Sequence, residues 1–230
     1  MTLLFATAFA LVPGQTFAAA VQPKLHDISF TVKLEWSSRA ELSKINRDFA
    51  MGYEADTAEV QYKDPLMLRG TAKINGQKAI YVIKGDTKTW YVPRLGAKVN
   101  QKVGNAPGKR QTLLDFGLVT TGMKDRFIMG KFVRKENGES VFDLHYAYEK
   151  DTSRHRVWVD PAKRVITKRM WYSQKGELMA TFNYSLHAKF GSVWVPQKMS
   201  VRNAEGKLAG VSLLSDIKVN QGIEDSVFNI

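Results

Sequence analysis

The chain has 230 residues, no cysteine and a formal net charge of +12 at pH 7. This length suits one well-filled domain, and 44% apolar residues with 24% charged residues is too apolar a composition for a disordered chain. The lack of cysteine excludes disulfides, thiolate metal sites, cysteine nucleophiles and a lipid anchor on an N-terminal cysteine. The aromatic share of 11% favours strands or a large apolar surface.

The N-terminal region is apolar and carries no charge before Lys24. Its apolar run from Leu3 to Val12 is too short to span a bilayer, and small residues that suit signal-peptide cleavage follow it at Ala18, Ala19 and Ala20. We therefore expect residues 1–20 to be a signal peptide, residues 21–230 to form a single domain, and the protein to be periplasmic. Because no basic residue precedes the apolar run, the alternative is a frayed apolar N-terminus.

Two short helices are predicted. The stretch Ser38-Arg39-Ala40-Glu41 has the pattern of a capping box, and Leu42, Ile45 and Phe49 then fall on one helical stripe. This pattern predicts a helix over 38–51. A second helix is expected over 110–116, where apolar residues cluster.

The segment 60–70 reads VQYKDPLMLRG and has a proline inside an apolar strand pattern. Proline cannot donate a hydrogen bond to a strand ladder, so Pro65 belongs at a bulge or an edge.

Most of the chain after position 60 has the pattern of β-strands separated by turns. Turn signals include Asn75-Gly76 and Asn137-Gly138, and between them apolar residues alternate with polar ones, as in 178–186. We expect a mainly β (α+β) fold with about ten or eleven antiparallel strands in one large, strongly curved sheet, whose apolar concave face is either closed as a barrel core or kept as a cavity. One or two helices would cover it, and they are too small to cover its whole concave face.

No catalytic motif is visible. The four histidines, His26, His145, His155 and His187, do not have metal-ligand spacing, and neither a nucleophile elbow nor a P-loop occurs. Asp143 and Asp160 could form a carboxylate pair, but Asp160 precedes a proline and is typical of a turn. We expect no enzymatic activity, no metal and no cofactor.

Two basic stretches stand out, one over 87–114 without any acid and one over 154–169 with a single acid. Such surfaces attract polyanions or anionic lipid. No nucleic-acid-binding motif accompanies the charge, so we expect no nucleic-acid partner. The alternative is that these are ordinary solvated strand faces.

At the level of motifs, the chain resembles the outer-membrane lipoprotein-sorting proteins, the LolA/LolB-like superfamily. The resemblance covers roughly 60–228 and rests on YKDPLMLRG, IKGDTKTWYVP, VWVDPAKRVITKRMWYSQKGELMATFNY, WVPQKMSVRNAEGK and a terminal DSVF. It implies a lidded half barrel whose apolar cavity takes lipoprotein acyl chains or another lipid. It also implies a monomer that transiently meets a membrane, or membrane proteins that donate and accept the cargo.

The resemblance, together with the apolar strand faces, suggests which residues form the site. We expect the cavity to be lined by Ile80, Val82, Trp90, Leu113, Leu114, Phe116, Phe142, Leu144, Tyr146, Phe182, Tyr184 and Leu186. The lid or rim would hold Lys63, Asp64, Pro65 and Arg69. Asp64 stands where the best-known carriers have an arginine that latches the lid, and a carboxylate cannot donate those hydrogen bonds. Lys63 or Arg69 is a candidate substitute.

Two other functions remain open at this stage. One is an envelope sensor or binding module on the same fold, with a protein partner. The other is a hydrolase of envelope polymers, which would need a polar cavity with clustered titratable groups.

Overall fold

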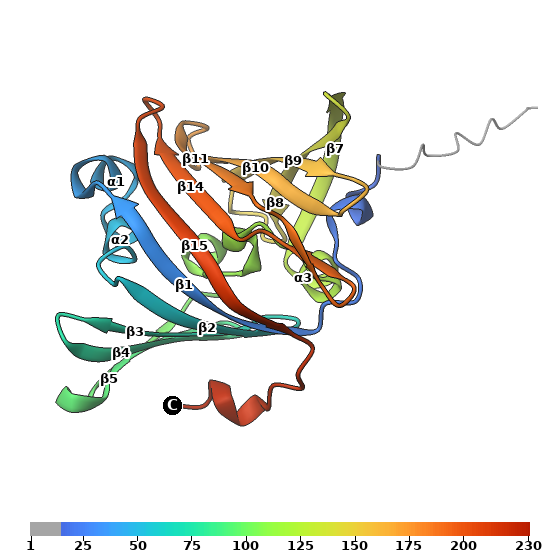
Figure 1. The fold of residues 1–230 in the computed structure, drawn as a ribbon. Helices are drawn as coiled ribbons and strands as arrows, with labels where there is room; N and C mark the ends of the chain where they lie inside the picture. The colour runs from blue at the N-terminus through green and yellow to red at the C-terminus, as the bar shows by residue number, and fades with distance from the viewer. Residues whose placement is uncertain (1–14) are drawn as a thin grey trace, which may run out of the picture.

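The computed structural model describes residues 15–230, and one antiparallel sheet dominates it (Figure 1). The sheet has thirteen strands in the order β6-β5-β4-β3-β2-β1-β15-β14-β11-β10-β9-β8-β7. Its strands in chain order are β1 (Asp27–Ser37), β2 (Thr57–Lys63), β3 (Met67–Ile74), β4 (Gln77–Lys84), β5 (Thr87–Val92), β6 (Ala97–Lys102), β7 (Ile128–Glu136), β8 (Glu139–Tyr146), β9 (Arg154–Asp160), β10 (Val165–Tyr172), β11 (Leu178–Ser185), β14 (Lys198–Asn203) and β15 (Leu208–Val219).

The sheet is strongly curved and open, as predicted (Figure 1). Its two edge strands, β6 and β7, do not pair with each other, so it is not closed into a barrel. The strand number exceeds the predicted ten or eleven, and β6, which is exposed at every residue, is the strand that burial marks least clearly. Two three-residue strands, β12 (Ala188–Phe190) and β13 (Val193–Val195), form a separate small sheet.

The chain forms two meanders that meet in the middle of the sheet. Strands β1 to β6 follow one another, β7 to β11 follow one another from the opposite edge, and β1 pairs with β15 between the two groups. Residues 103–127, between the two edge strands, form a crossover segment that lies in the hollow of the sheet (Figure 1). This segment contains the 3-10 helices η3 (Pro107–Lys109) and η4 (Leu113–Phe116) and the helix α3 (Thr121–Arg126).

The predicted helix over 38–51 is two helices, α1 (Arg39–Ile45) and α2 (Arg47–Met51). The break is at Asn46, whose backbone is extended (φ −169, ψ 141) and whose side chain accepts hydrogen bonds from the backbone N–H groups of Asp48 and Phe49. Asn46 therefore caps a new helix instead of continuing the first. The second predicted helix, over 110–116, is shorter than expected and corresponds to η4.

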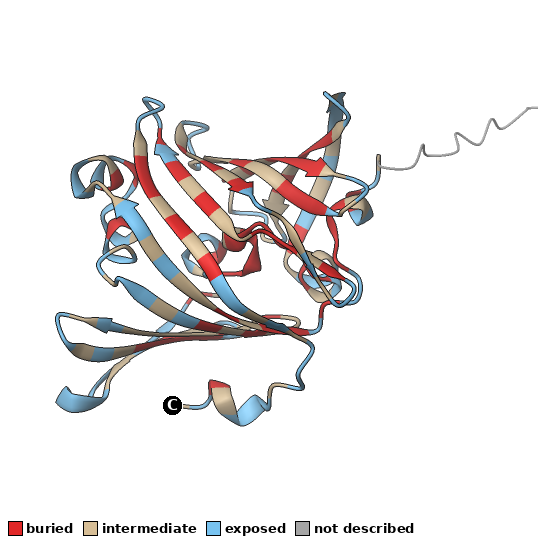
Figure 2. Cartoon of the chain, in the orientation of Figure 1, coloured by how far each residue is buried: buried red, intermediate tan, exposed pale blue. Residues whose placement is uncertain are grey.

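The two faces of the sheet are covered differently. The inner face carries the main hydrophobic core, into which η4 and α3 pack from the crossover segment. The outer face of β3 to β5 carries a small second cluster, which is closed by the 3-10 helix η5 (Asp225–Phe228) near the C-terminus. Figure 2 shows that burial alternates along β14 and β15, as expected for strands with one covered face.

The predicted signal peptide falls largely on residues 1–14, which lie outside the described residues. The predicted cleavage region lies in the 3-10 helix η1 (Phe17–Ala20), where Phe17 and Ala20 are buried. The ring of Phe17 packs edge-on against Phe142, with 5.8 Å between the ring centroids. Cleavage after Ala20 would remove this contact. Within residues 15–230, no helix has the length and apolarity needed to cross a membrane.

Candidate functional site

The inner face of β1 to β6 carries a row of apolar residues that crosses all six strands, next to Lys88, whose Nζ lies 5.6 Å from the centroid of the Tyr81 ring. Partners that face each other in antiparallel strands lie on the same side of the sheet. One such row runs through Phe30, Val60, Gly70, Tyr81, Trp90 and Val99. Along the row the exposed fraction rises from 3% at Phe30 to 43% at Trp90 and 64% at Val99. The apolar inner face therefore continues beyond the part that the protein itself covers.

The neighbouring row on the same face is built from small side chains. It pairs Val32 with Ala58, Ala58 with Ala72, and Ala72 with Ala79. At Gly70, a Cβ atom would meet no heavy atom within 4 Å. We call the uncovered part of the inner face the open area; it comprises Gly70, Ala72, Ala79, Trp90 and Val99.

The inner face of the other half of the sheet is covered by the crossover segment. Eight of the twelve predicted lining residues meet in its main core: Leu113, Leu114, Phe116, Phe142, Leu144, Tyr146, Phe182 and Tyr184. Three of them belong to η4, and the others stand on strands of β7 to β11. A ninth, Trp90, lies on the same inner face at the open area, with its ring 4.7 Å from that of Tyr81.

The remaining three predicted lining residues lie elsewhere. Ile80 and Val82 face outward and pack under η5, while Tyr81 and Ile83 between and beside them face inward. All four residues are apolar, so alternation could not indicate which pair faces the hollow. Leu186 is 62% exposed, because its left-handed backbone (φ 54) ends the alternation of β11.

Asp64 and Pro65 form the turn between β2 and β3 and contact the crossover segment. The Asp64 carboxylate accepts hydrogen bonds from the backbone N–H of Gly122 at 3.0 Å and from the hydroxyl of Thr120. Thr120 is the N-cap of α3. A Cβ atom on Gly122 would lie 2.6 Å from Asp64 Oδ2. Asp64 thus holds the beginning of α3 as an acceptor, where an arginine would have to donate.

Lys63 and Arg69 point to the opposite face from the crossover segment. Lys63 Nζ donates to the carbonyl of Ile223 at 2.8 Å and pairs with Asp225 at 2.6 Å. Arg69 Nη1 donates to the carbonyl of Val227 at 2.6 Å. Both residues therefore fasten the C-terminal segment to the outer face, and neither replaces a lid latch. Lys63 and Arg69 directly follow Tyr62 and Leu68, which face inward. Alternation along the strands therefore already indicated that Lys63 and Arg69 face outward.

A buried arginine on the inner face escaped the sequence analysis. The side chain of Arg169 is 4% exposed and pairs with Asp115 of η4 at 3.0 Å. Its guanidinium also lies 4.0 Å from the centroid of the Phe182 ring. Burial alone would lower the pKa of Arg169, but Tyr184 and Asp115 outweigh burial and raise it, so the residue is a cation at any physiological pH.

His155 is buried on β9, the strand that pairs with β10, and its strand partner there is Trp171, two residues beyond Arg169. Its Nε2 is 3.3 Å from the hydroxyl of Tyr146. Burial, with smaller contributions from Arg169 and His145, holds the pKa of His155 well below its usual value, so the ring is neutral at pH 7. The sequence of these strands shows only the usual alternation of apolar residues. Nothing in it indicates that Arg169 and His155 are buried.

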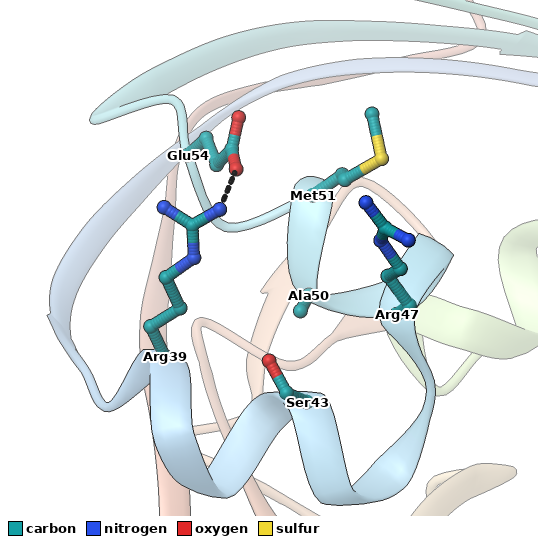
Figure 3. Close-up of a pocket in the computed structure, with 6 residues that line it drawn as sticks. All are labelled: Arg39, Ser43, Arg47, Ala50, Met51 and Glu54. Atoms are coloured by element: carbon teal, nitrogen blue, oxygen red, sulfur yellow. Dashed lines mark ion pairs between the residues drawn. The ribbon is translucent and has the colours of Figure 1, made fainter.

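Two surface pockets of residues 15–230 can be compared with the predicted site, and only one of them contains a predicted residue. One, with a volume of about 510 Å³, lies between α1 and α2 and is lined by Arg39, Ser43, Arg47, Ala50, Met51 and Glu54 (Figure 3). The other, of about 430 Å³, includes the predicted residue Tyr146 together with Met129 and His145. Among residues 15–230, no three His, Asp or Glu side chains come close enough together to hold a metal ion.

Comparison with known proteins gives matches mainly at the level of the fold. A family described as an uncharacterized protein matches residues 137–230. No functionally curated protein matches the chain. A crystal structure described as an outer membrane lipoprotein-sorting protein domain from Vibrio parahaemolyticus superposes with a TM-score of 0.59 at 16% identity, covering 93% of each chain.

Two further crystal structures agree with this match. A LolA superfamily protein from Nitrosomonas europaea gives a TM-score of 0.61 at 14% identity, covering 96% of this chain and 99% of that one. A DUF1329 family protein from Desulfovibrio piger gives 0.58 at 15% identity, with 92% and 95% covered. The chain therefore has the fold of the LolA-like lipoprotein-sorting proteins, as the motif resemblance predicted.

Proposed function

We propose that this protein is a periplasmic carrier that binds lipid or lipoprotein acyl chains on the inner face of its sheet and moves them toward the outer membrane. One observation carries the proposal. A row of apolar residues crosses the inner face of β1 to β6, and its outer part at Trp90 and Val99 is left uncovered. The fold similarity to lipoprotein-sorting domains supports the same reading.

The physical need for such a face is large. A sixteen-carbon chain left in water costs about 12 kcal/mol, at about 0.8 kcal/mol for each methylene group. Small residues around Gly70 leave room above the strands. An acyl chain bound there would be shielded from water and would cover the exposed Trp90 and Val99.

The crossover segment supplies the way to enlarge the site. Three of its contacts with the sheet are made through side chains: Asp64 binds α3, Asp115 binds Arg169, and the hydroxyl of Tyr81 accepts from the backbone N–H of Gln111 at 3.3 Å. One backbone hydrogen bond, from the N–H of Ile166 to the carbonyl of Gly117 at 3.4 Å, joins it to β10. Such contacts can open without breaking the strand ladders. We infer that the segment acts as a lid, whose movement would extend the open area into the core below η4.

The test introduces a charge into the open area. Gly70→Glu places a carboxylate on the inner face, where it would have to be desolvated by an acyl chain. Thr71→Glu is the matched control, since it adds the same charge to the next residue of β3, on the outer face. We expect Gly70→Glu to weaken binding of a fluorescent fatty acid at least tenfold, and Thr71→Glu to leave it near wild type.

Native mass spectrometry of protein purified from its own host gives the second readout. We expect a co-purified lipid on the wild type and much less on Gly70→Glu. An unloaded wild type that also takes up no fluorescent fatty acid would refute the carrier function. Equal binding by the two glutamate variants would refute the open area as its site.

A further inference from the structure

Arg169 stands in the middle of an otherwise apolar row. On the inner face the strand partners run Phe142, Val157, Arg169, Phe182 and Val201. The four apolar members of the row are each no more than 2% exposed. A buried cation in such surroundings is costly unless its charge and its N–H groups are matched. Packing alone therefore gives no reason for an arginine at this position.

The partners of Arg169 are incomplete. A guanidinium has five N–H donors, and Nε of Arg169 is buried without a hydrogen-bond partner among residues 15–230. The nearby His155 has a second such atom, Nδ1, also buried and unpartnered in the described chain. Two buried polar atoms without a hydrogen-bond partner, Arg169 Nε and His155 Nδ1, thus lie in the same apolar interior.

The only carboxylate that pairs with Arg169 within residues 15–230 comes from the crossover segment. In η4, the sequence Leu113-Leu114-Asp115-Phe116 places three buried apolar side chains around one carboxylate. The hydroxyl of Tyr184 holds the same turn by donating to the carbonyls of Leu114 and Asp115, at 3.3 Å each. This helix therefore presents to the sheet what an anionic amphiphile would present: apolar groups together with one negative charge.

We propose that Arg169 is the anion-binding residue of an internal site for an amphiphile with one anionic headgroup, and that Asp115 occupies this site until the ligand displaces η4. The headgroup is a carboxylate or a phosphate, since both accept paired hydrogen bonds from a guanidinium. The inference rests on the proposed carrier function and narrows it, because an acyl chain without a charged head would leave Arg169 unmatched.

The experiment compares ligands that share a twelve-carbon chain and differ in the headgroup. Laurate, dodecyl phosphate and the uncharged dodecanol compete for the protein with a neutral fluorescent probe, N-phenyl-1-naphthylamine. For the wild type we expect both anions to displace the probe at concentrations about tenfold lower than dodecanol, a ratio typical of one charge-assisted hydrogen-bonded pair.

Two variants isolate the anion site. Asp115→Asn removes the competing charge, and its amide oxygen can still accept from the backbone N–H of Thr112, a bond that Asp115 makes at 3.0 Å. We expect it to bind the anions several-fold more tightly and dodecanol as the wild type does. Arg169→Met keeps an apolar side chain of similar length, and we expect it to abolish the preference for anions while dodecanol still binds.

The outcomes separate this proposal from the function on which it rests. If all three ligands bind equally to the wild type and to Asp115→Asn, the anion site is refuted and the carrier function stands. If none binds, the carrier function fails and the anion site with it. Preference for only one of the two anions supports the site and identifies its headgroup. The Asp115→Asn arm retains Arg169, so it decides the matter even if Arg169→Met does not fold.

Discussion

The Asp64 carboxylate accepts a hydrogen bond from the backbone N–H of Gly122 at 3.0 Å and so ties the turn between β2 and β3 to the beginning of α3. An acidic side chain is the appropriate one for this position, because the first N–H groups of a helix lack partners within the helix. The best-known carriers that the chain resembles have at this position an arginine, which donates hydrogen bonds. Here Asp64 instead accepts a hydrogen bond from a backbone N–H group.

Replacing this acceptor should loosen the crossover segment. Asp64→Arg removes a charged hydrogen-bond acceptor, at a cost of about 1–3 kcal/mol, and we expect faster hydrogen exchange over 120–126 and faster release of a bound fatty acid. Asp125→Arg makes the same change of charge at an exposed position of α3 and serves as control. Release at the wild-type rate by Asp64→Arg would rule out a latch at this turn.

The C-terminal segment should be separable from ligand binding. Arg69→Met removes the donor to the Val227 carbonyl, so we expect η5 to detach and the C-terminal residues to become sensitive to carboxypeptidase. Fatty-acid affinity should stay within about twofold of wild type, because η5 covers the outer face. Lys73→Met, an exposed position on the same strand, is the control. A large loss of affinity in Arg69→Met would place the C-terminal segment in the binding site after all.

His155 should make stability depend on pH. Its folded-state pKa lies well below its ordinary value of about 6.5. Between these two values the unfolded chain takes up a proton and the folded chain does not, so stability is full above pH 6.5 and falls as the pH drops below it. The loss approaches about 1.4 kcal/mol for each pH unit.

Urea denaturation at pH 7.5, 6.5 and 5.5 measures this dependence. We expect His155→Gln to flatten the fall of the unfolding free energy, and His26→Gln, at an exposed position, to retain it. An identical pH dependence in the wild type and in His155→Gln would show that other groups are responsible.

The N-terminus of the mature chain can be determined directly. We expect the intact mass of protein from the periplasm to correspond to cleavage near Ala18 to Ala20. A mature chain that keeps Phe17 would contradict that site. In such a chain Phe17→Ala should cost about 3 kcal/mol, because the ring is buried against Phe142.

Much of the architecture could be predicted because it depends on period-two patterning. Alternation such as that of Phe182 and Tyr184 indicates one covered face, and a long antiparallel sheet must curl. The inner face was predictable wherever polar residues mark the other side. It was not predictable in β4, where Ile80 to Ile83 are all apolar and where η5, distant in sequence, covers the second face.

The polar part of the candidate site was beyond the reach of sequence patterns. Arg169 lies in a basic stretch and reads as a solvated side chain, yet it faces inward, where Asp115, more than fifty positions earlier in the chain, neutralises it. Likewise, the role of Asp64 depends on α3, a six-residue helix that its sequence TGMKDR gives little reason to expect. Contacts between distant segments decided both cases.

The pairing of β1 with β15 has a consequence for how the molecule forms. Register partners such as Ile28 and Val219 lie near opposite ends of the chain. Every other pair in this sheet joins strands that are consecutive in sequence, except the pair of β11 and β14. Each meander can zip up from local hairpins, but the seam between them must close the longest loop available in the chain. The hollow of the sheet is therefore completed only when β15 pairs with β1, the step that joins the two meanders into one surface.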